Sequence, residues 1–135
     1  MQVENFWVGL DVGADELVAC MVDAEGRVRV EEAMPTCPSR VSAFMEAHAG
    51  DKVRIGLEAG SSCLPLTRKL RQAGYKVHVF DTRQASKFLS IRQNKTDAND
   101  ARGIADIVRI GRGVVAEVYV KSVECQQLRS KLAIR

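Results

Sequence analysis

The sequence predicts an α/β fold built on a mixed β-sheet, with helices on both faces. Three observations predict it. The chain opens with runs at 6–12, 16–23 and 27–33 that are separated by short turns, which indicates an antiparallel meander. Apolar strand patterns at 53–59 and 76–80 then alternate with helical patterns, which is typical of parallel βα units. A chain of 135 residues, 46% of them hydrophobic, is long enough to bury one core.

The strand patterns differ in how deeply they should be buried. FWVGLDV (6–12) is continuously apolar and rich in β-branched residues, which predicts a buried strand, and a turn at Gly13 leads into the second run, ELVACMVD. RVRVEEA (27–33) alternates, with Val28 and Val30 on one face, so we predict a half-exposed strand at the edge of the sheet.

Helical periodicity marks the segments between and after these strands. Pro38 can begin a helix that Gly50 ends, and Gly74 ends a second one with a Leu66–Leu70 stripe. Thr96 is the expected N-cap of a third helix. The remaining expectations are a polar, basic link at 82–96, a strand or extended connection at 113–120 and a helix at 122–135.

Composition excludes several classes of protein. The net charge is only +3, there is no run of 18 apolar residues, and the first residues lack the basic start and long apolar stretch of a signal peptide. The four cysteines are spaced singly without C-x-x-C, so we expect reduced thiols in a cytoplasmic protein that does not contact the membrane. The two histidines, His48 and His78, are isolated and are interpreted as structural.

Acidic residues follow two of the predicted strands. Asp11 lies near the end of the first strand, and Glu58 lies near the end of the fourth. Functional groups of open α/β sheets collect at the carboxyl ends of the strands. If the first and fourth strands are parallel neighbours, the two carboxylates therefore converge at one edge of the sheet.

Two further carboxylates lie in the segment RQNKTDANDARGIADIV (92–108). Its apolar stripe is Ala101, Ile104, Ala105 and Val108. At about 100° per residue, Asp97 and Asp100 point the same way as this stripe. Asp106 is nine residues beyond Asp97, about 180° around the helix, so we expect it to be a solvated charge.

The grouping of carboxylates has two interpretations. Acidic residues in a first helical turn commonly interact with the helix dipole, and this alone would explain Asp97 and Asp100. It does not explain why both share the core face. Several partly buried carboxylates are costly unless a cation neutralises them, and Mg²⁺ or Mn²⁺ held by Asp11, Glu58, Asp97 and Asp100 would do so. Two such ions roughly 4 Å apart can catalyse phosphodiester chemistry.

In this order and spacing, GLDVG, GLEAGSS and KTDANDARGIAD resemble motifs of the DEDD-type transposases of bacterial insertion sequences, the family that includes Piv-type DNA invertases. The resemblance covers nearly the whole chain, and its K-T-D-x-x-D-A part is the specific one. It implies an RNase H-like, RuvC-like fold and a catalytic, metal-binding tetrad of Asp11, Glu58, Asp97 and Asp100. It also implies DNA cleavage and strand transfer by the full-length enzyme, a structured guide RNA and a homo-oligomer.

The sequence departs from the family pattern in two motifs and in length. Gly13-Ala14 stands where a Ser-Lys pair is common, and EAGSS replaces EATG. The chain stops at Arg135 in a helical pattern, so we expect a RuvC-like domain at 1–120 and, at 121–135, the start of a helical segment leading to a missing C-terminal domain. Such a fragment is expected to be inactive alone.

A basic stretch lies between the fifth strand and the third helix. Arg83, Lys87, Arg92 and Lys95 carry four positive charges with no acid among them. They form either an ordinary solvated face or a strip that contacts nucleic-acid phosphates.

Other classes of function stay open at this point. GLDVGADELVACMVDAEGRV also resembles the first phosphate motif of actin-like and sugar-kinase ATP-binding lobes. A catalytically silent binding or dimerisation module is a further alternative, and so is a Holliday-junction resolvase of the RuvC type, against which the K-T-D-x-x-D-A motif argues.

Overall fold

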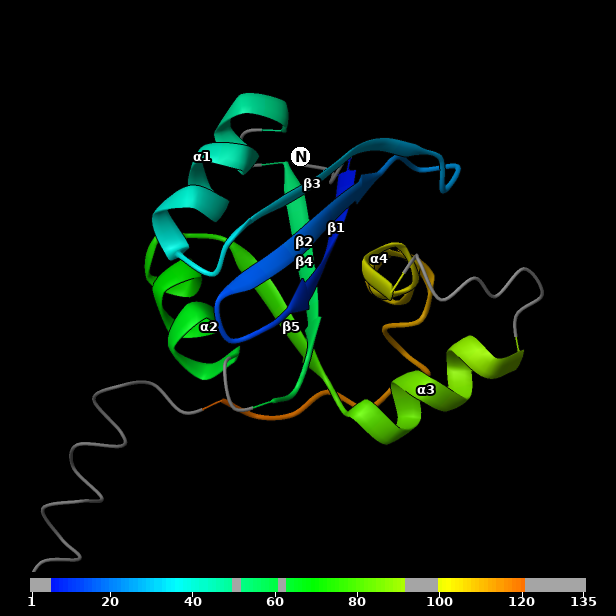
Figure 1. Ribbon diagram of the computed structural model, residues 1–135. Coiled ribbons are helices and arrows are strands. Elements are labelled where there is room, and N and C mark those ends of the chain that lie inside the picture. Colours follow the sequence, from blue (N-terminus) through cyan, green and yellow to red (C-terminus); the bar gives the residue numbers. More distant parts are fainter. Residues whose placement is uncertain (1–5, 50–51, 61–62, 92–99, 121–135) are drawn as a thin grey trace, which may run out of the picture.

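The computed structural model describes residues 6–49, 52–60, 63–91 and 100–120, which form a five-stranded mixed sheet between helices (Figure 1). The order of the strands is β3-β2-β1-β4-β5. The strands are β1 (Phe6–Val12), β2 (Glu16–Val22), β3 (Val28–Pro35), β4 (Val53–Glu58) and β5 (Lys76–Phe80). The helices are α1 (Pro38–His48), α2 (Cys63–Gln72), α3 (Thr82–Ile91) and α4 (Asp100–Ile110).

The strand pairing confirms the predicted meander and the parallel units. β1 pairs antiparallel with β2, and β2 pairs antiparallel with β3, which lies at the edge of the sheet as expected. β4 pairs parallel with β1 on its other side, and β5 continues the parallel arrangement. The first and fourth strands are therefore the parallel neighbours on which the predicted convergence of Asp11 and Glu58 depends.

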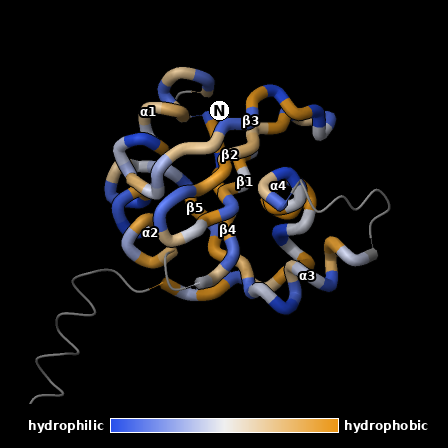
Figure 2. Tube along the Cα trace, in the orientation of Figure 1, coloured by the Kyte–Doolittle hydropathy of each residue, from blue (hydrophilic) through white to orange (hydrophobic). Residues whose placement is uncertain are grey.

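One face of the sheet is covered by α1 and α2. Successive strand residues point to opposite faces, so Val8 and Leu10 of β1 lie on one face while Gly9 and Asp11 lie on the other. The first face buries the larger core, and Figure 2 shows hydrophobic residues running through the strands. Among the fully buried members of this core are Val8, Leu10, Leu17, Ile55, Leu57, Met45 and Leu70.

The opposite face is covered by α4, which lies directly against the backbone of the sheet. Gly9 of β1 and Gly56 of β4 are register partners on this face. A Cβ atom at Gly9 would overlap the carbonyl oxygen of Ala101 and the backbone nitrogen of Ala105. At Gly56 it would lie 2.8 Å from Cβ of Val108. The absence of side chains at this glycine pair therefore allows the close approach of the helix.

α3 is a difference from the sequence prediction, which placed a polar link at 82–96. Asp81 caps the helix, since its Oδ2 accepts a hydrogen bond of 3.0 Å from the backbone N–H of Gln84. Ala85, Phe88 and Leu89 follow at helical spacing and pack against a core that contains Val108. Arg83 and Lys87 lie exposed on the solvent side of the helix, and these charges led to the interpretation of the segment as a polar link. Residues 92–96 and the predicted helix at 122–135 lie outside the described part of the chain.

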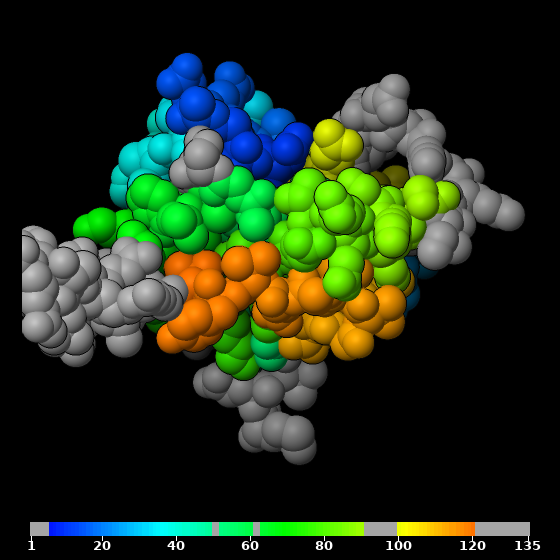
Figure 3. All heavy atoms as spheres, turned by 90° about the horizontal axis from the view of Figure 1, so that it is seen from below, coloured from blue at the N-terminus to red at the C-terminus, as the bar shows by residue number. Residues whose placement is uncertain are grey.

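Residues 116–120 form an extended connection along β5, so this part of the predicted segment 113–120 follows one of its two alternatives, whereas 113–115 belong to a turn in which the N–H groups of Val114 and Val115 donate to the carbonyl oxygen of Gly111. A single antiparallel bridge joins Phe80 to Glu117. Figure 3 shows this segment, in orange, on the surface beside α3. Val115 packs with Phe80 on the α4 side of the sheet, whereas Val120 joins the core beneath α1 and α2. The segment therefore crosses the edge of the sheet.

Two findings bear on the predicted class of protein. In the part of the chain that the structure describes, no helix is long and apolar enough to cross a membrane. Cys20, Cys37 and Cys63 are free thiols, two of them buried. The fourth, Cys125, lies outside the described residues.

We predict that Gly9→Ala destabilises the fold by roughly 1–3 kcal/mol, because the added methyl group pushes the backbone of α4 off the sheet. Gly113→Ala is the control, since nothing lies within 4 Å of a Cβ atom built there. Urea unfolding of the wild type, Gly9→Ala and Gly113→Ala measures the free energy of unfolding of each protein. Equal stabilities for Gly9→Ala and the wild type would show that α4 does not lie against β1.

Candidate acidic site at the carboxyl edge of the sheet

The candidate site begins with two carboxylates on adjacent strands. Asp11 lies near the carboxyl end of β1, and Glu58 is the last residue of β4. Each lies two residues beyond a member of the glycine pair, so both share the face that α4 covers. The strand pairing thus brings together the two residues that the sequence placed at strand ends.

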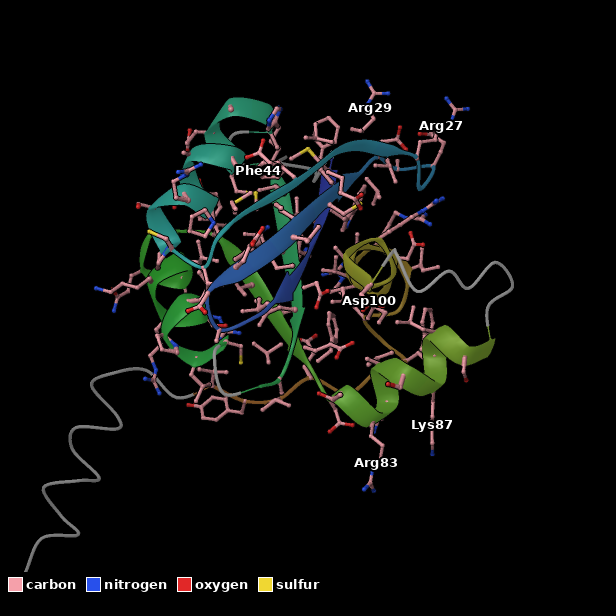
Figure 4. The ribbon with its side chains drawn as sticks, in the orientation of Figure 1. Arg27, Arg29, Phe44, Arg83, Lys87 and Asp100 are labelled. Carbon is pink, nitrogen blue, oxygen red and sulfur yellow. The ribbon has the colours of Figure 1, made fainter. Side chains whose placement is uncertain are left out.

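A third carboxylate comes from the first residue of α4. Asp100 lies one residue before Ala101, whose backbone packs on Gly9. Figure 4 labels Asp100 on the side of α4 that faces the sheet. Because α4 is held at the glycine pair, its first turn is fixed close to the carboxyl ends of β1 and β4.

The pKa values show that the three carboxyl groups interact. Asp11 is exposed but partly desolvated by its neighbours; this desolvation raises its pKa, and the negative charge of Asp100 raises it further. Burial is also the largest cause of the raised pKa of Glu58, followed by the charges of Asp11 and Asp100. The charge of Asp100 therefore disfavours ionisation of Asp11 and Glu58, as expected for carboxylates that share a partly desolvated site.

The described part of this site is open and incomplete. Glu58 is half-buried, while Asp11 and Asp100 are exposed. Among residues 6–49, 52–60, 63–91 and 100–120, no group of three histidine, cysteine, aspartate or glutamate side chains is close enough to hold a metal ion. Asp97, the predicted fourth member, lies outside these residues. The described carboxylates therefore interact through their charges but do not by themselves form a complete set of metal ligands.

The prediction for Asp106 was wrong. It was expected to be solvated, but it is only 6% exposed. Its Oδ1 accepts a hydrogen bond of 3.3 Å from Nη2 of Arg109, and Nη1 of Arg109 donates to the carbonyl oxygen of Ala24 in the β2–β3 turn. The angular estimate failed because α4 is contacted on a second side by this turn. Asp106 and Arg109 therefore fix the end of α4 remote from the acidic site.

Comparison with known protein families identifies the family of the chain. Residues 8–135 match the family model of the IS110-type DEDD transposases, described as transposase. The chain belongs to this transposase family. No curated protein matches it. The match covers the segments that contain Asp11, Glu58, Asp97 and Asp100, and it favours a transposase domain over the ATP-binding lobe that the first motif also resembles.

Solved structures show the fold of this transposase domain. The structure of RuvC from Thermus thermophilus in complex with a Holliday junction substrate superposes with a TM-score of 0.60 at 13% identity, covering 84% of this chain and 99% of that one. A second structure of Thermus thermophilus RuvC gives the same TM-score at 14% identity, with the same coverage. The RuvC-like, RNase H-like fold predicted from the sequence is thereby confirmed.

The predicted basic strip of the transposase domain is only partly described. Arg83 and Lys87 are one helical turn apart on α3, and both are exposed (Figure 4). α3 begins next to the acidic site, because Oγ1 of Thr82 donates a hydrogen bond of 3.0 Å to the carbonyl oxygen of Ala59, the residue after Glu58. Arg92 and Lys95 lie outside the described residues.

The glycine pair is the feature of the site that sequence reasoning missed. A signal was present: Gly9 and Gly56 interrupt two otherwise apolar strand patterns, and each precedes a carboxylate by two residues. Glycine inside a strand often marks the close approach of another backbone. This pattern could have predicted which face of the sheet the last helix covers.

Proposed function

We propose that this domain supplies the catalytic carboxylates for divalent-metal-dependent DNA strand cleavage and transfer in a full-length transposase. The observation that carries the proposal is the electrostatic interaction among Asp11, Glu58 and Asp100, which come from two strand ends and one helix start. Burial raises the pKa values of Asp11 and Glu58, and the negative charge of Asp100 raises both further. A cluster that costs free energy when ionised is the arrangement expected of a site that a cation neutralises.

The donor set fits Mg²⁺ or Mn²⁺ in its chemistry. Carboxylate oxygens are the ligands that hard divalent cations prefer, and three of them face one solvent-accessible edge of the sheet. We assign Asp97 as the fourth ligand, from the segment directly before α4. When bound, the metal would activate a water molecule and stabilise the leaving oxygen of a phosphodiester. The contribution of the chain is to hold the carboxylates and to leave the edge open for a nucleic-acid strand.

DNA is the partner that membership of the transposase family supports. Arg83 and Lys87 would contact phosphates beside the cleavage site, together with Arg92 and Lys95, since α3 begins next to Ala59. The superposed RuvC structure contains a Holliday junction, which is a DNA substrate of that protein. A guide RNA, a homo-oligomer and a second domain that completes strand transfer are the further expectations of the family resemblance.

Divalent metal is expected to stabilise the chain against heat. If the dissociation constant is about 1 mM, about 10 mM Mg²⁺ adds roughly 1.4 kcal/mol to the free energy of unfolding. This corresponds to a rise in Tm of about 3–6 °C. Asp11→Asn should raise the metal-free Tm at pH 7, because it removes one charge from the cluster, and it should lose most of the rise with metal. Thermal melts at constant ionic strength, with and without Mg²⁺ or Mn²⁺, measure both.

The matched control is Glu25→Gln, an exposed carboxylate in the β2–β3 turn at a distance from the site. It should change neither the metal-free Tm nor the response to metal. Asp106 is unsuitable as a control, since its buried carboxylate bonds to Arg109. A metal response that survives Asp11→Asn at full size would contradict the assignment of the site.

The basic strip is tested by the salt dependence of DNA binding. In the full-length protein, Arg83→Ala and Lys87→Ala should each lower the slope of log affinity against log salt by about one unit, because each removes one phosphate contact. Arg40→Ala on α1, on the opposite face of the sheet, is the control and should leave the slope unchanged. An unchanged slope in both α3 variants would eliminate α3 from the DNA-binding surface.

A further inference from the structure

The strand that carries Glu58 is held to its neighbour one residue beyond its own end. β4 ends at Glu58, whose register partner, Phe80, is the last residue of β5. The next residue, Ala59, uses both of its backbone polar groups. Its N–H donates to the carbonyl oxygen of Phe80 at 2.9 Å, and its carbonyl oxygen accepts from Oγ1 of Thr82 at 3.0 Å. Glu58 is therefore followed by a residue that is still fixed to the end of β5 and the start of α3.

The hydroxyl group of Thr82 replaces a hydrogen bond that the sheet no longer supplies at this point. In a parallel ladder, a residue donates its N–H to the residue before its neighbour and accepts from the N–H of the residue after it. The neighbour of Ala59 would be Asp81, so its carbonyl oxygen would accept from the backbone N–H of residue 82. β5 has ended here, because Thr82 is the first residue of α3. The side chain of Thr82 donates in place of its backbone.

The first turn of α3, which presents this hydroxyl group, is itself fixed. The backbone N–H of Asp81 donates to the carbonyl oxygen of Ala116 at 2.8 Å, and Oδ2 of Asp81 accepts from the N–H of Gln84. Oε1 of Gln84 in turn accepts from the N–H of Ala116 at 2.8 Å. Thr82 therefore donates to the end of β4 from a position that the capping of α3 and the segment 116–120 determine.

The bond from Thr82 holds the chain on one side of the sheet just before the chain turns to the other. The described hydrogen bonds of Gly60, the next residue, lead to Cys63 of α2. α2 and α3 lie on opposite sides of the sheet (Figure 1), and α3 packs on the α4 side through Ala85. Nothing lies within 4 Å of a Cβ atom built on Gly60, and glycine adopts a wide range of backbone conformations. The hydroxyl group of Thr82 thus holds the end of β4 on the α4 side.

We propose that Thr82 is a positioning residue for Glu58: its hydroxyl group holds the end of β4 on the side of the sheet where Asp11 and Asp100 lie. Without this bond, the peptide after Glu58 is free to follow the chain toward α2, and the carboxylate spends less of its time in the acidic site. The same bond joins the strand of this carboxylate to α3, the helix of the proposed phosphate contacts. The effect of Thr82 on metal binding rests on the proposed function, whereas its effect on the backbone of Ala59 does not.

Amide hydrogen exchange in the metal-free full chain, read by NMR, tests the backbone effect. Thr82→Val keeps the branched shape and removes the hydroxyl group, so the amide of Ala59 should exchange about fivefold faster. Thr82→Ser retains the donor and should restore the wild-type rate. The matched control is Thr36→Val, which removes a hydroxyl group that donates to the carbonyl oxygen of Gly13 at 2.8 Å and should leave Ala59 unchanged. An unchanged rate at Ala59 in Thr82→Val would overturn the proposal. Should Thr82→Val not fold, Thr82→Ala removes the same bond and takes its place.

Calorimetric titration with Mn²⁺ separates positioning of Glu58 from a merely structural role. Removing a group that orients a metal ligand weakens metal binding by about tenfold or more, so Thr82→Val should raise the dissociation constant by about that factor and Thr82→Ser should restore it. A structural role alone would lower the Tm of Thr82→Val and leave the dissociation constant at the wild-type value, and this result would also overturn the proposal. A wild type that binds no Mn²⁺ would contradict the proposed function instead, and the amide of Ala59 would then decide alone whether Thr82 holds the end of β4.

Discussion

The close approach of α4 to β1 and β4 is the contact on which the rest of the domain depends. It exists because two register partners in the middle of the sheet, Gly9 and Gly56, have no side chains. The backbone of the helix at Ala101 and Ala105 lies where the Cβ atom of any other residue at position 9 would be. Any side chain there would move the helix outward and carry Asp100 away from the strand ends.

The same contact sets the electrostatics of the acidic edge. Asp11 and Glu58 are two residues beyond the glycines, and Asp100 is one residue before Ala101, so a single docking interaction determines where all three lie. This placement partly buries Asp11 and Glu58 and brings the charge of Asp100 near them, and both effects raise their pKa values. At the other end of α4, Arg109 donates to both Asp106 and the carbonyl oxygen of Ala24 in the β2–β3 turn, and this contact keeps the helix from pivoting about the glycines.

Much of the fold could be predicted because the core follows simple periodicities. Alternation in RVRVEEA gave the edge strand, and the placement of Asp11 and Glu58 followed from the rule that strand ends carry functional groups. α3 was missed because its apolar stripe is only Ala85, Phe88 and Leu89 among polar residues. The burial of Asp106 was not predicted because a helical projection assumes a single buried face, whereas α4 is contacted by both the sheet and the β2–β3 turn. The angular position of a residue on a helix does not show whether a segment distant in sequence packs against that side of the helix.

The most direct test of this account is a ¹³C NMR titration of the side-chain carboxyl groups in the wild type and in Asp100→Asn, in metal-free buffer. If α4 brings Asp100 to the strand ends, removing its charge must lower the pKa of both Asp11 and Glu58 toward ordinary values, while burial keeps them somewhat raised. Asp23 is the control: the hydrogen bond from the backbone N–H of Arg27 holds its pKa below the usual range in the remote β2–β3 turn, and this pKa should not change. Unchanged pKa values for Asp11 and Glu58 in Asp100→Asn would contradict the docking of α4 and, with it, the assembly of the acidic site.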